Sequence, residues 1–267
     1  MDDGLRLEDR TRAHQWKDRV RLPPARTDVP QHEEWCEVKE GDEWQRIRFH
    51  DYASIFERPG LYEHLFYDRL ECNSPRRVVQ LLREVLAEPG SLRDPLRAID
   101  LGAGNGIVAK ELRRAGADAV IGIDIIPEAK SAAERDRPEV YTRYLVADLC
   151  TPTPQVESTI RDLRPNALVC VAALGFGDIP PLAYFNSLAF VPKGGVLAFN
   201  IKEEFLDQRY AHGFSELVRR MLEAKVIRLE ASRRYCHRLS VAGEPLFYHA
   251  MVATKLDDVP RSMLVES

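Results

Sequence analysis

The feature that most constrains the fold of this chain is a glycine-rich loop between a strand-like run and a helix. Residues 97–101 read Arg-Ala-Ile-Asp-Leu, and glycine then occupies every second position, as Gly102, Gly104 and Gly106. The following segment, residues 107–112, has the composition of a helix. Because glycine has no Cβ, such a loop can adopt positive φ and lets a ligand lie against the backbone. The pattern predicts a strand, a ligand-binding loop and a helix.

The spacing of these glycines disfavours two common ligand-binding loops. A dinucleotide-binding loop follows G-x-G-x-x-G, and its third glycine would fall at the position of Ile107. A phosphate-binding loop would continue as Gly-Lys-Ser/Thr, which does not occur here. A nicotinamide oxidoreductase therefore stays only as a weaker alternative.

Three acids follow strand-like runs at equal intervals. Asp100, Asp124 and Asp148 each come at the end of an apolar run, and 24 residues separate each acid from the next. This interval suits a strand, a helix and a return in a right-handed βαβ unit. The three carboxylates would then lie at the carboxyl edge of one parallel sheet, where open α/β sheets bind their ligands.

The glycine loop and the three acids together resemble motif I and the following strands of the class I S-adenosylmethionine (SAM)-dependent methyltransferases. The resemblance implies an α/β fold, with a doubly wound, mostly parallel seven-stranded sheet that ends in an antiparallel hairpin. The runs 226–240 and 245–254 around residues 241–244 match the last two strands of such a sheet. The resemblance is specific for residues 97–201, only architectural for 214–255, and does not cover 1–50.

The resemblance also assigns roles at the carboxyl edge of the sheet. The glycine loop and Asp100 would hold the methionine end of SAM, and Asp148 would take the adenine amino group. Asp124 would accept hydrogen bonds from both ribose hydroxyls, since a carboxylate offers two acceptor oxygens to a vicinal diol. The full expected cofactor set is Asp100, Gly102, Ala103, Gly104, Asn105, Gly106, Asp124, Ile125, Ala147, Asp148, Leu149, Cys170, Val171 and Tyr52.

The methyl acceptor is less well defined by the sequence. His212 and Asp178 follow expected strand ends and are the first candidates for a catalytic base, with His50, His237 and His249 left open. The expected substrate-binding residues are Tyr62, Tyr67, Phe176 and Tyr184. The segment 174–181 lacks the Asp/Asn-Pro-Pro-Tyr/Phe signature of amino-group methylation, and it carries one acid, so no metal site is predicted.

The N-terminal part is expected to form a lid over the site. Residues 35–38 and 44–49 flank the turn-like segment 39–42 and predict a hairpin, while 61–67 has helical spacing of its apolar residues. Ser74 and Pro75 predict a helix cap and first helical position. We therefore expect an N-terminal arm, hairpin and lid in residues 1–73 and a SAM-binding domain in 74–267.

Composition narrows the class of function. A net charge of −4 gives no support for nucleic-acid or membrane binding. Five scattered cysteines and an N-terminus without a signal-peptide core favour a reduced, cytoplasmic setting. We expect a SAM-dependent methyltransferase acting on a small molecule, at oxygen or nitrogen rather than carbon. A catalytically inactive SAM-binding regulatory or partner protein is the alternative, and a monomer and a homodimer both stay open.

Overall fold

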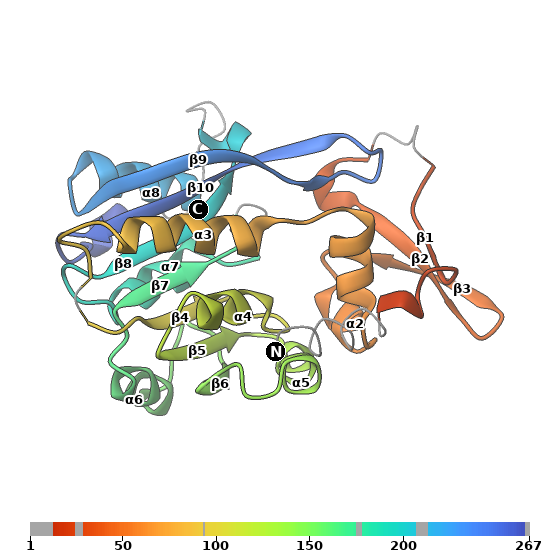
Figure 1. Cartoon of the computed structure of the whole chain (residues 1–267), viewed down its shortest axis with the longest axis horizontal. Helices are drawn as coiled ribbons and strands as arrows, with labels where there is room; N and C mark the ends of the chain where they lie inside the picture. Colours follow the sequence, from red (N-terminus) through yellow and green to blue (C-terminus); the bar gives the residue numbers. More distant parts are fainter. Residues whose placement is uncertain (1–12, 25–28, 93, 175–177, 207–212, 265–267) are drawn as a thin grey trace.

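The computed structural model describes residues 13–24, 29–92, 94–174, 178–206 and 213–264. Its centre is a seven-stranded sheet with the strand order β6-β5-β4-β7-β8-β10-β9 (Figure 1). The first five strands in this order are parallel, whereas β10 runs antiparallel to both β8 and β9. The strands are β4 Arg97–Leu101, β5 Ala119–Asp124, β6 Arg143–Val146, β7 Ala167–Cys170, β8 Val196–Lys202, β9 Ile227–Leu239 and β10 Pro245–Lys255.

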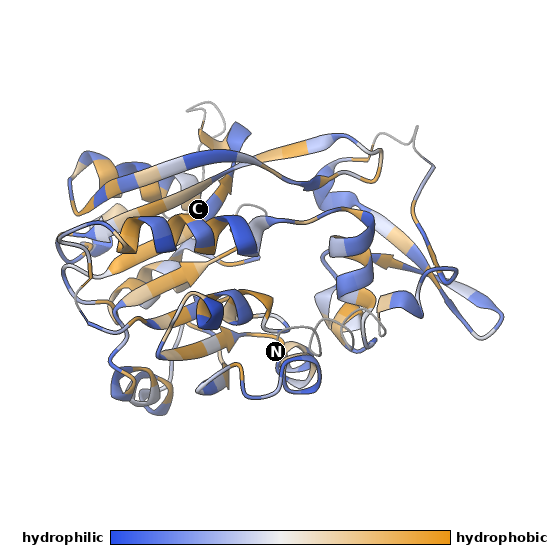
Figure 2. Cartoon of the chain, viewed as in Figure 1, coloured by the Kyte–Doolittle hydropathy of each residue, from blue (hydrophilic) through white to orange (hydrophobic). Residues whose placement is uncertain are grey.

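Helices cover both faces of this sheet, as expected of strands that are apolar throughout. Helices α3 and α4 bury Val78, Leu82 and Leu112 against one face. Helices α6, α7 and α8 bury Ile160 and Leu217, among others, against the opposite face. Figure 2 shows the apolar strands between helices whose outer sides are hydrophilic. The helices are α3 Ser74–Leu86, α4 Ile107–Arg114, α5 Pro127–Asp136, α6 Pro154–Asp162, α7 Pro181–Leu188 and α8 Phe214–Glu223, and short 3-10 helices span Gln31–Glu33, Glu203–Leu206 and Arg261–Met263.

The N-terminal region forms a second, smaller unit with its own apolar cluster. Its sheet has the order β1-β2-β3, formed by Val20–Arg21, Trp35–Glu40 and Glu43–Arg48. Helix α2, Tyr52–Phe56, and a π-helix, Glu63–Arg69, follow it. In Figure 1 the hairpin β9–β10 reaches along the top from the large sheet to this unit. Val241 at the hairpin tip belongs to the N-terminal apolar cluster, so the two ends of the chain share a core.

A buried ion pair also joins the hairpin to the N-terminal unit. Arg238 of β9 donates to Glu34, whose other carboxylate oxygen accepts from the backbone N–H of Val241 at 2.7 Å. Both side chains are at most 5% exposed. A buried charge is tolerated where it is paired and hydrogen-bonded, so this contact fixes the position of the hairpin relative to the N-terminal sheet.

The predicted fold is confirmed, with three local differences. The segment 61–67 is helical as expected but in part π-helical, a form common at functional sites. Strand β1, which has two residues, was not predicted. The cap of α3 is Asn73 rather than Ser74, because the Ser74 hydroxyl turns inward and bonds Tyr235 and His237 instead. No helix in the described ranges is long and apolar enough to cross a membrane.

Candidate functional site: a cavity between the glycine loop and the N-terminal unit

The glycine loop forms a tight turn between β4 and α4. The N–H groups of Gly102 and Ala103 both donate to the Ile123 carbonyl, at 2.9 and 3.1 Å, which holds the loop against β5. Gly102 has φ +73°, and a Cβ there would lie 2.9 Å from the Cβ of Ala173. A side chain at this position would therefore strain the backbone and collide with the loop after β7.

Two tyrosines from the segment before and within β6 hold the loop from the other side. The Tyr144 hydroxyl donates to the Gly104 carbonyl at 2.8 Å. The Tyr141 hydroxyl lies 2.8 Å from Asp100 Oδ2 and 3.0 Å from the Ala103 carbonyl. These contacts keep the loop backbone in one conformation and so prepare the surface on which a ligand would lie.

Asp124, at the end of β5, is the main anchor of the loop. Its Oδ2 accepts from the Gly104 N–H at 2.8 Å, and its Oδ1 accepts from the Ile126 N–H at 3.0 Å. Burial raises the pKa of this carboxyl, while the backbone donors at Gly104 and Ile126 act in the opposite direction. Each oxygen of a carboxylate has a second lone-pair site, so both can accept a further hydrogen bond from a ligand.

Asp100 lies under the loop rather than on the cavity wall. Its side chain is fully buried, and its Oδ1 has no hydrogen-bond partner among the described residues. Burial raises the pKa of Asp100 to about 7, with a smaller contribution of the same sign from Asp124 and an opposing one from the Tyr141 hydroxyl. The Asp100 carboxyl group accepts a hydrogen bond from Tyr141, one of the two tyrosines that hold the loop.

A cavity of about 250 Å³ opens above the loop, between the carboxyl edge of the sheet and the N-terminal unit. We call it the cofactor cavity. Ile125 lines it with an exposed fraction of 61%, which leaves an apolar surface for a ring. The residues expected at the site that line this cavity are Gly102, Gly104, Asp124, Ile125, Ala147, Asp148, Leu149, Val171, Tyr52, Tyr62 and Asp178.

The other expected site residues lie elsewhere. Ala103, Asn105, Gly106 and Cys170 are buried behind the wall. Tyr184 is in the core, where its ring packs 4.7 Å from that of Phe214, because α7 turns it toward the sheet. Tyr67 lines a separate hollow beside Glu63 and Arg137. His212 and Phe176 fall outside the described residues.

A second, smaller cavity adjoins the cofactor cavity on the side of the N-terminal sheet. Five residues line both: His50, Tyr52, Tyr62, Ala172 and Asp178. The remaining wall of this second cavity comes from Gln31, Phe49, Phe66, Cys72, Leu174, His237, Arg238 and Tyr248. Most of these residues were not identified in the sequence, since they come from both ends of the chain and share no motif.

His50 and Asp178 meet where the two cavities join. His50 Nδ1 lies 3.0 Å from Asp178 Oδ1, and each side chain is 26% exposed. Asp178 was expected at the site, and His50 was one of several histidines left open. They are 128 residues apart, so no spacing rule could have paired them.

Ala172, also on the shared wall, has an unusual backbone conformation. Its φ is +58°, in the left-handed region, which costs an L-residue other than glycine roughly 1–2 kcal/mol. Its N–H donates to Asn200 Oδ1 at 2.7 Å, and this bond helps to hold the conformation. Backbone strain of this kind is found preferentially at ligand sites.

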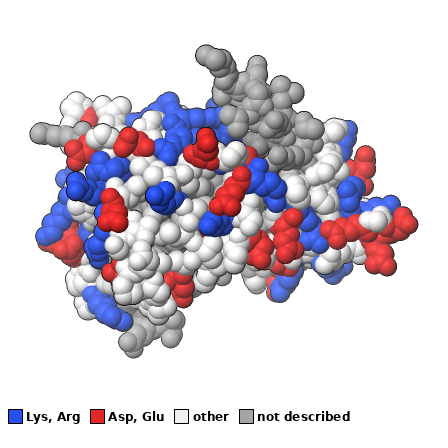
Figure 3. Space-filling view, turned by 90° about the horizontal axis from the view of Figure 1, so that it is seen from below, with Lys and Arg blue, Asp and Glu red and all other residues white. Residues whose placement is uncertain are grey.

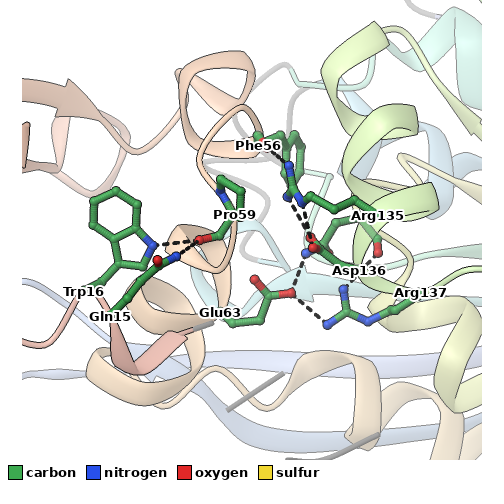
Figure 4. Close-up of polar contacts among 9 residues, drawn as sticks. Gln15, Trp16, Phe56, Pro59, Glu63, Arg135, Asp136 and Arg137 are labelled. Carbon is green, nitrogen blue, oxygen red and sulfur yellow. Dashed lines mark hydrogen bonds and ion pairs between the residues drawn. The ribbon is translucent and has the colours of Figure 1, made fainter. Parts of the chain in front are cut away.

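The N-terminal unit is tied to the glycine loop and to α5 by a set of polar contacts (Figure 4). Glu63 accepts from Asn105 Nδ2 at 2.7 Å and from Arg137 at 2.8 Å, and Arg137 also donates to the Asn105 carbonyl. Arg135 reaches the carbonyl of Phe56 at 3.0 Å. Because Asn105 is part of the glycine loop, the position of the π-helix is linked directly to that of the cofactor loop.

The residues of the cofactor cavity fit SAM. The sulfonium cofactor has no phosphate, and the loop offers close backbone approach at Gly102 and Gly104 without a cationic side chain. The Asp124 carboxylate suits a ribose diol, and Ile125 offers an apolar face for an adenine ring. Figure 3 shows acidic and basic side chains interspersed over the face seen from below.

Comparison with known proteins identifies the family. The sequence profile described as "Methyltransferase domain" matches residues 72–235, which is more than half of the chain. The chain belongs to this methyltransferase family. The methyltransferase domain expected from the sequence is thus confirmed.

Individual relatives resemble this methyltransferase over part of its length. A ribosomal protein L11 methyltransferase from Paraburkholderia xenovorans is 36% identical over 87 residues, which are 31% of this chain and 28% of the relative. One from Burkholderia cenocepacia is 33% identical over 95 residues, 34% of this chain and 31% of the relative. The chain thus spans less than a third of these curated relatives.

Solved structures agree on the fold. The N-methyltransferase NodS of Bradyrhizobium japonicum, in complex with S-adenosyl-L-homocysteine (SAH), superposes with a TM-score of 0.52 at 16% identity. This match covers 78% of the methyltransferase described here and 97% of NodS.

Proposed function

We propose that this methyltransferase transfers a methyl group from SAM to an oxygen or nitrogen atom of a small-molecule acceptor bound in the second cavity. The observation that carries the proposal is the junction of the two cavities at His50 and Asp178. SAM in the first cavity and an acceptor in the second would then meet at a titratable pair. Residues 1–73 would serve as the lid, and 74–267 as the SAM-binding domain.

The residues of the chain would contribute mainly orientation and a route for a proton. Asp124 would accept hydrogen bonds from the ribose, Ile125 would lie against adenine, and Asp148 would bond its amino group. When bound, SAM supplies an electrophilic methyl group. The Asp178–His50 pair would take up the proton that a hydroxyl or amine acceptor loses, and Tyr52 and Tyr62 would exclude water from the junction.

A protein acceptor is the second candidate, because the curated relatives are named as methyltransferases of ribosomal protein L11. That similarity spans only about a third of the chain. The second cavity is small and walled by Phe49, Phe66 and Tyr248, which favours a compact acceptor over a protein side chain on a folded partner. A SAM-binding protein without transferase activity is the third candidate.

Methyl-labelled SAM separates these candidates. The enzyme is incubated with labelled SAM and either a cell extract freed of macromolecules or purified ribosomal protein L11. We expect the label in a small molecule, identified by mass spectrometry, and not in the protein. Label in L11 alone would refute the small-molecule proposal. Calorimetric SAM binding with no labelled product in either fraction would favour the inactive binder, and binding of NAD without SAM would refute all three.

A further inference from the structure

The second cavity contains a histidine that a β-bulge directs into it. Phe247 and Leu246 of β10 are consecutive, yet they pair with Cys236 and Arg238, so His237 is the extra residue of β9. Its carbonyl accepts from the Asn73 N–H at 2.9 Å, outside the ladder. Bulges of this kind re-aim a side chain and occur often beside active sites. The His237 side chain lines the second cavity and is 6% exposed.

A chain of hydrogen bonds fixes which nitrogen of this histidine carries the proton. The Ala172 N–H donates to Asn200 Oδ1 at 2.7 Å, so the Asn200 amide nitrogen faces Tyr235 and donates to its hydroxyl at 2.9 Å. Ser74 Oγ, at 2.6 Å, is the one acceptor that the described residues offer to the buried Tyr235 hydroxyl, so we assign the Tyr235 proton to this bond. Ser74 Oγ also accepts from Asn200 Nδ2 at 3.3 Å, so its own proton is directed to His237 Nδ1, at 2.6 Å.

The direction of this chain makes His237 a hydrogen-bond donor toward the cavity. Nδ1 accepts a hydrogen bond, so the neutral ring carries its proton on Nε2. Burial, and then the neighbouring Arg238 guanidinium, hold the pKa of His237 well below its usual range, which keeps the ring neutral. Among the described residues, this ring has a hydrogen bond at Nδ1 only. A histidine left open as a base thus acts as a donor.

Apart from the Asp178–His50 pair at its junction with the cofactor cavity, the second cavity also offers a hydrogen-bond acceptor. Gln31 Nε2 donates to the Tyr248 hydroxyl at 2.9 Å, while its buried Oε1 has no partner in the described part of the chain. The His237 ring packs on the same Tyr248, with centroids 4.2 Å apart. Arg238 is neutralised by Glu34. The wall therefore presents a donor and an acceptor on either side of Tyr248, among aromatic rings.

We propose that the second cavity recognises a neutral planar group of the acceptor, of the lactam or heteroaromatic amide class, which accepts from His237 Nε2–H and donates to Gln31 Oε1. This inference rests on the proposed function, because it names the class of acceptor for that site. An anionic ring would leave its charge buried against the Gln31 oxygen, so carboxylated rings are excluded. Ser74 and Asn200 are positioning residues, which set the tautomer of His237.

Binding of small probes to the enzyme saturated with SAH tests the recognition. We expect 2-pyridone, a neutral ring with adjacent donor and acceptor, to bind more tightly than benzoate in ligand-observed NMR titrations. His237→Phe and Gln31→Leu should each weaken 2-pyridone binding by roughly tenfold, as expected when a buried polar group loses its partner. His249→Phe is the matched control, because His249 lies on neighbouring β10 and lines neither cavity.

Benzoate binding as tightly as 2-pyridone would overturn the inference. So would 2-pyridone that does not bind the wild-type enzyme, or that binds both variants as tightly as the wild type. Since His237→Phe deprives the Ser74 hydroxyl of its acceptor and can impair folding, ¹⁵N NMR of the wild-type histidine gives a second test. We expect a neutral ring protonated at Nε2 at neutral pH, and a mixture of tautomers in Ser74→Ala. A ring protonated at Nδ1 would refute the proposal. Failure of SAH to bind at the outset would instead count against the proposed function.

Discussion

Asp124→Ala tests the cofactor cavity at its most connected residue. The Asp124 carboxylate already holds the Gly104 and Ile126 N–H groups, at 2.8 and 3.0 Å, and its remaining lone pairs would serve the ribose hydroxyls. Alanine removes both sets of bonds. Two lost ribose bonds to a charged acceptor amount to roughly 2–3 kcal/mol, or about 30- to 160-fold in Kd. Loss of the two loop bonds should also lower the free energy of unfolding by about 1–3 kcal/mol, because the N–H groups of Gly104 and Ile126 lose their acceptor. Water at the cavity wall can replace part of these bonds and so limits the loss.

Calorimetry with SAH and urea denaturation measure these two effects separately. Asp124→Asn should give a smaller loss in both, since the amide keeps one oxygen acceptor. Asp118→Ala is the matched control, because Asp118 is an exposed acid at the opposite end of β5, and neither quantity should change. A folded Asp124→Ala protein with less than a threefold change in Kd would refute the assignment of Asp124 to the cofactor.

Three further predictions follow from the same region. Gly102→Ala should weaken SAH binding at least tenfold. Gly116 also has a positive φ but nothing within 4 Å of an added Cβ, so Gly116→Ala should cost only about 1 kcal/mol of folding stability and leave Kd unchanged. Equal Kd values for the two variants would contradict the steric argument. Because burial raises the pKa of Asp100 from 3.8 to about 7, the folded protein keeps this proton between those pH values while the unfolded chain releases it. The free energy of unfolding should therefore fall as pH rises through this window. Asp100→Asn should remove about 4 kcal/mol of that fall, measured by urea denaturation at several pH values. The same dependence on pH in the wild type and in the variant would contradict this prediction. Glu63→Ala should destabilise the protein by about 3–5 kcal/mol, because it removes the carboxylate that pairs with the buried Arg137 and accepts from Asn105; a loss below about 1 kcal/mol would show that other contacts hold the π-helix.

The parts that the sequence predicted well are those where local pattern and global fold agree. The buried strands are apolar, the helices begin at prolines such as Pro127, and the acids recur at a βαβ interval. Asp124 could be assigned to the cavity because β5, which it ends, stops at the same edge of the sheet as β4, from which the glycine loop begins. The glycines at 102, 104 and 106 each have positive φ, as their spacing suggested.

The second cavity was missed because its walls depend on tertiary contacts alone. Gln31 and His237 are brought together by Tyr248, and no periodicity relates residues so far apart. Ser74 had the right local signal for a cap, but the buried contact with His237 determined where its hydroxyl points. The orientation of a polar side chain in a buried network depends on its hydrogen-bond partners, and the pattern of one segment does not show which distant residues these are.

The way the second cavity is built has a consequence for the role of the N-terminal region. Glu34 is completely buried, and it neutralises Arg238, the residue after the bulged His237. Deleting residues 1–50 would remove Gln31 and His50 from the wall of the second cavity, and would also expose Arg238 and Leu61. Loss of activity in such a truncation would therefore not show whether these residues act on the acceptor or only stabilise the fold. Tyr52→Phe is the cleaner change, because it removes one hydroxyl at the junction of the cavities and keeps the ring that stacks on Phe56. Tyr67→Phe is the control, because Tyr67 lies outside both cavities. We expect Tyr52→Phe to lower turnover at unchanged SAH affinity, which would assign the N-terminal lid to the acceptor. Equal effects of Tyr52→Phe and Tyr67→Phe would contradict that role.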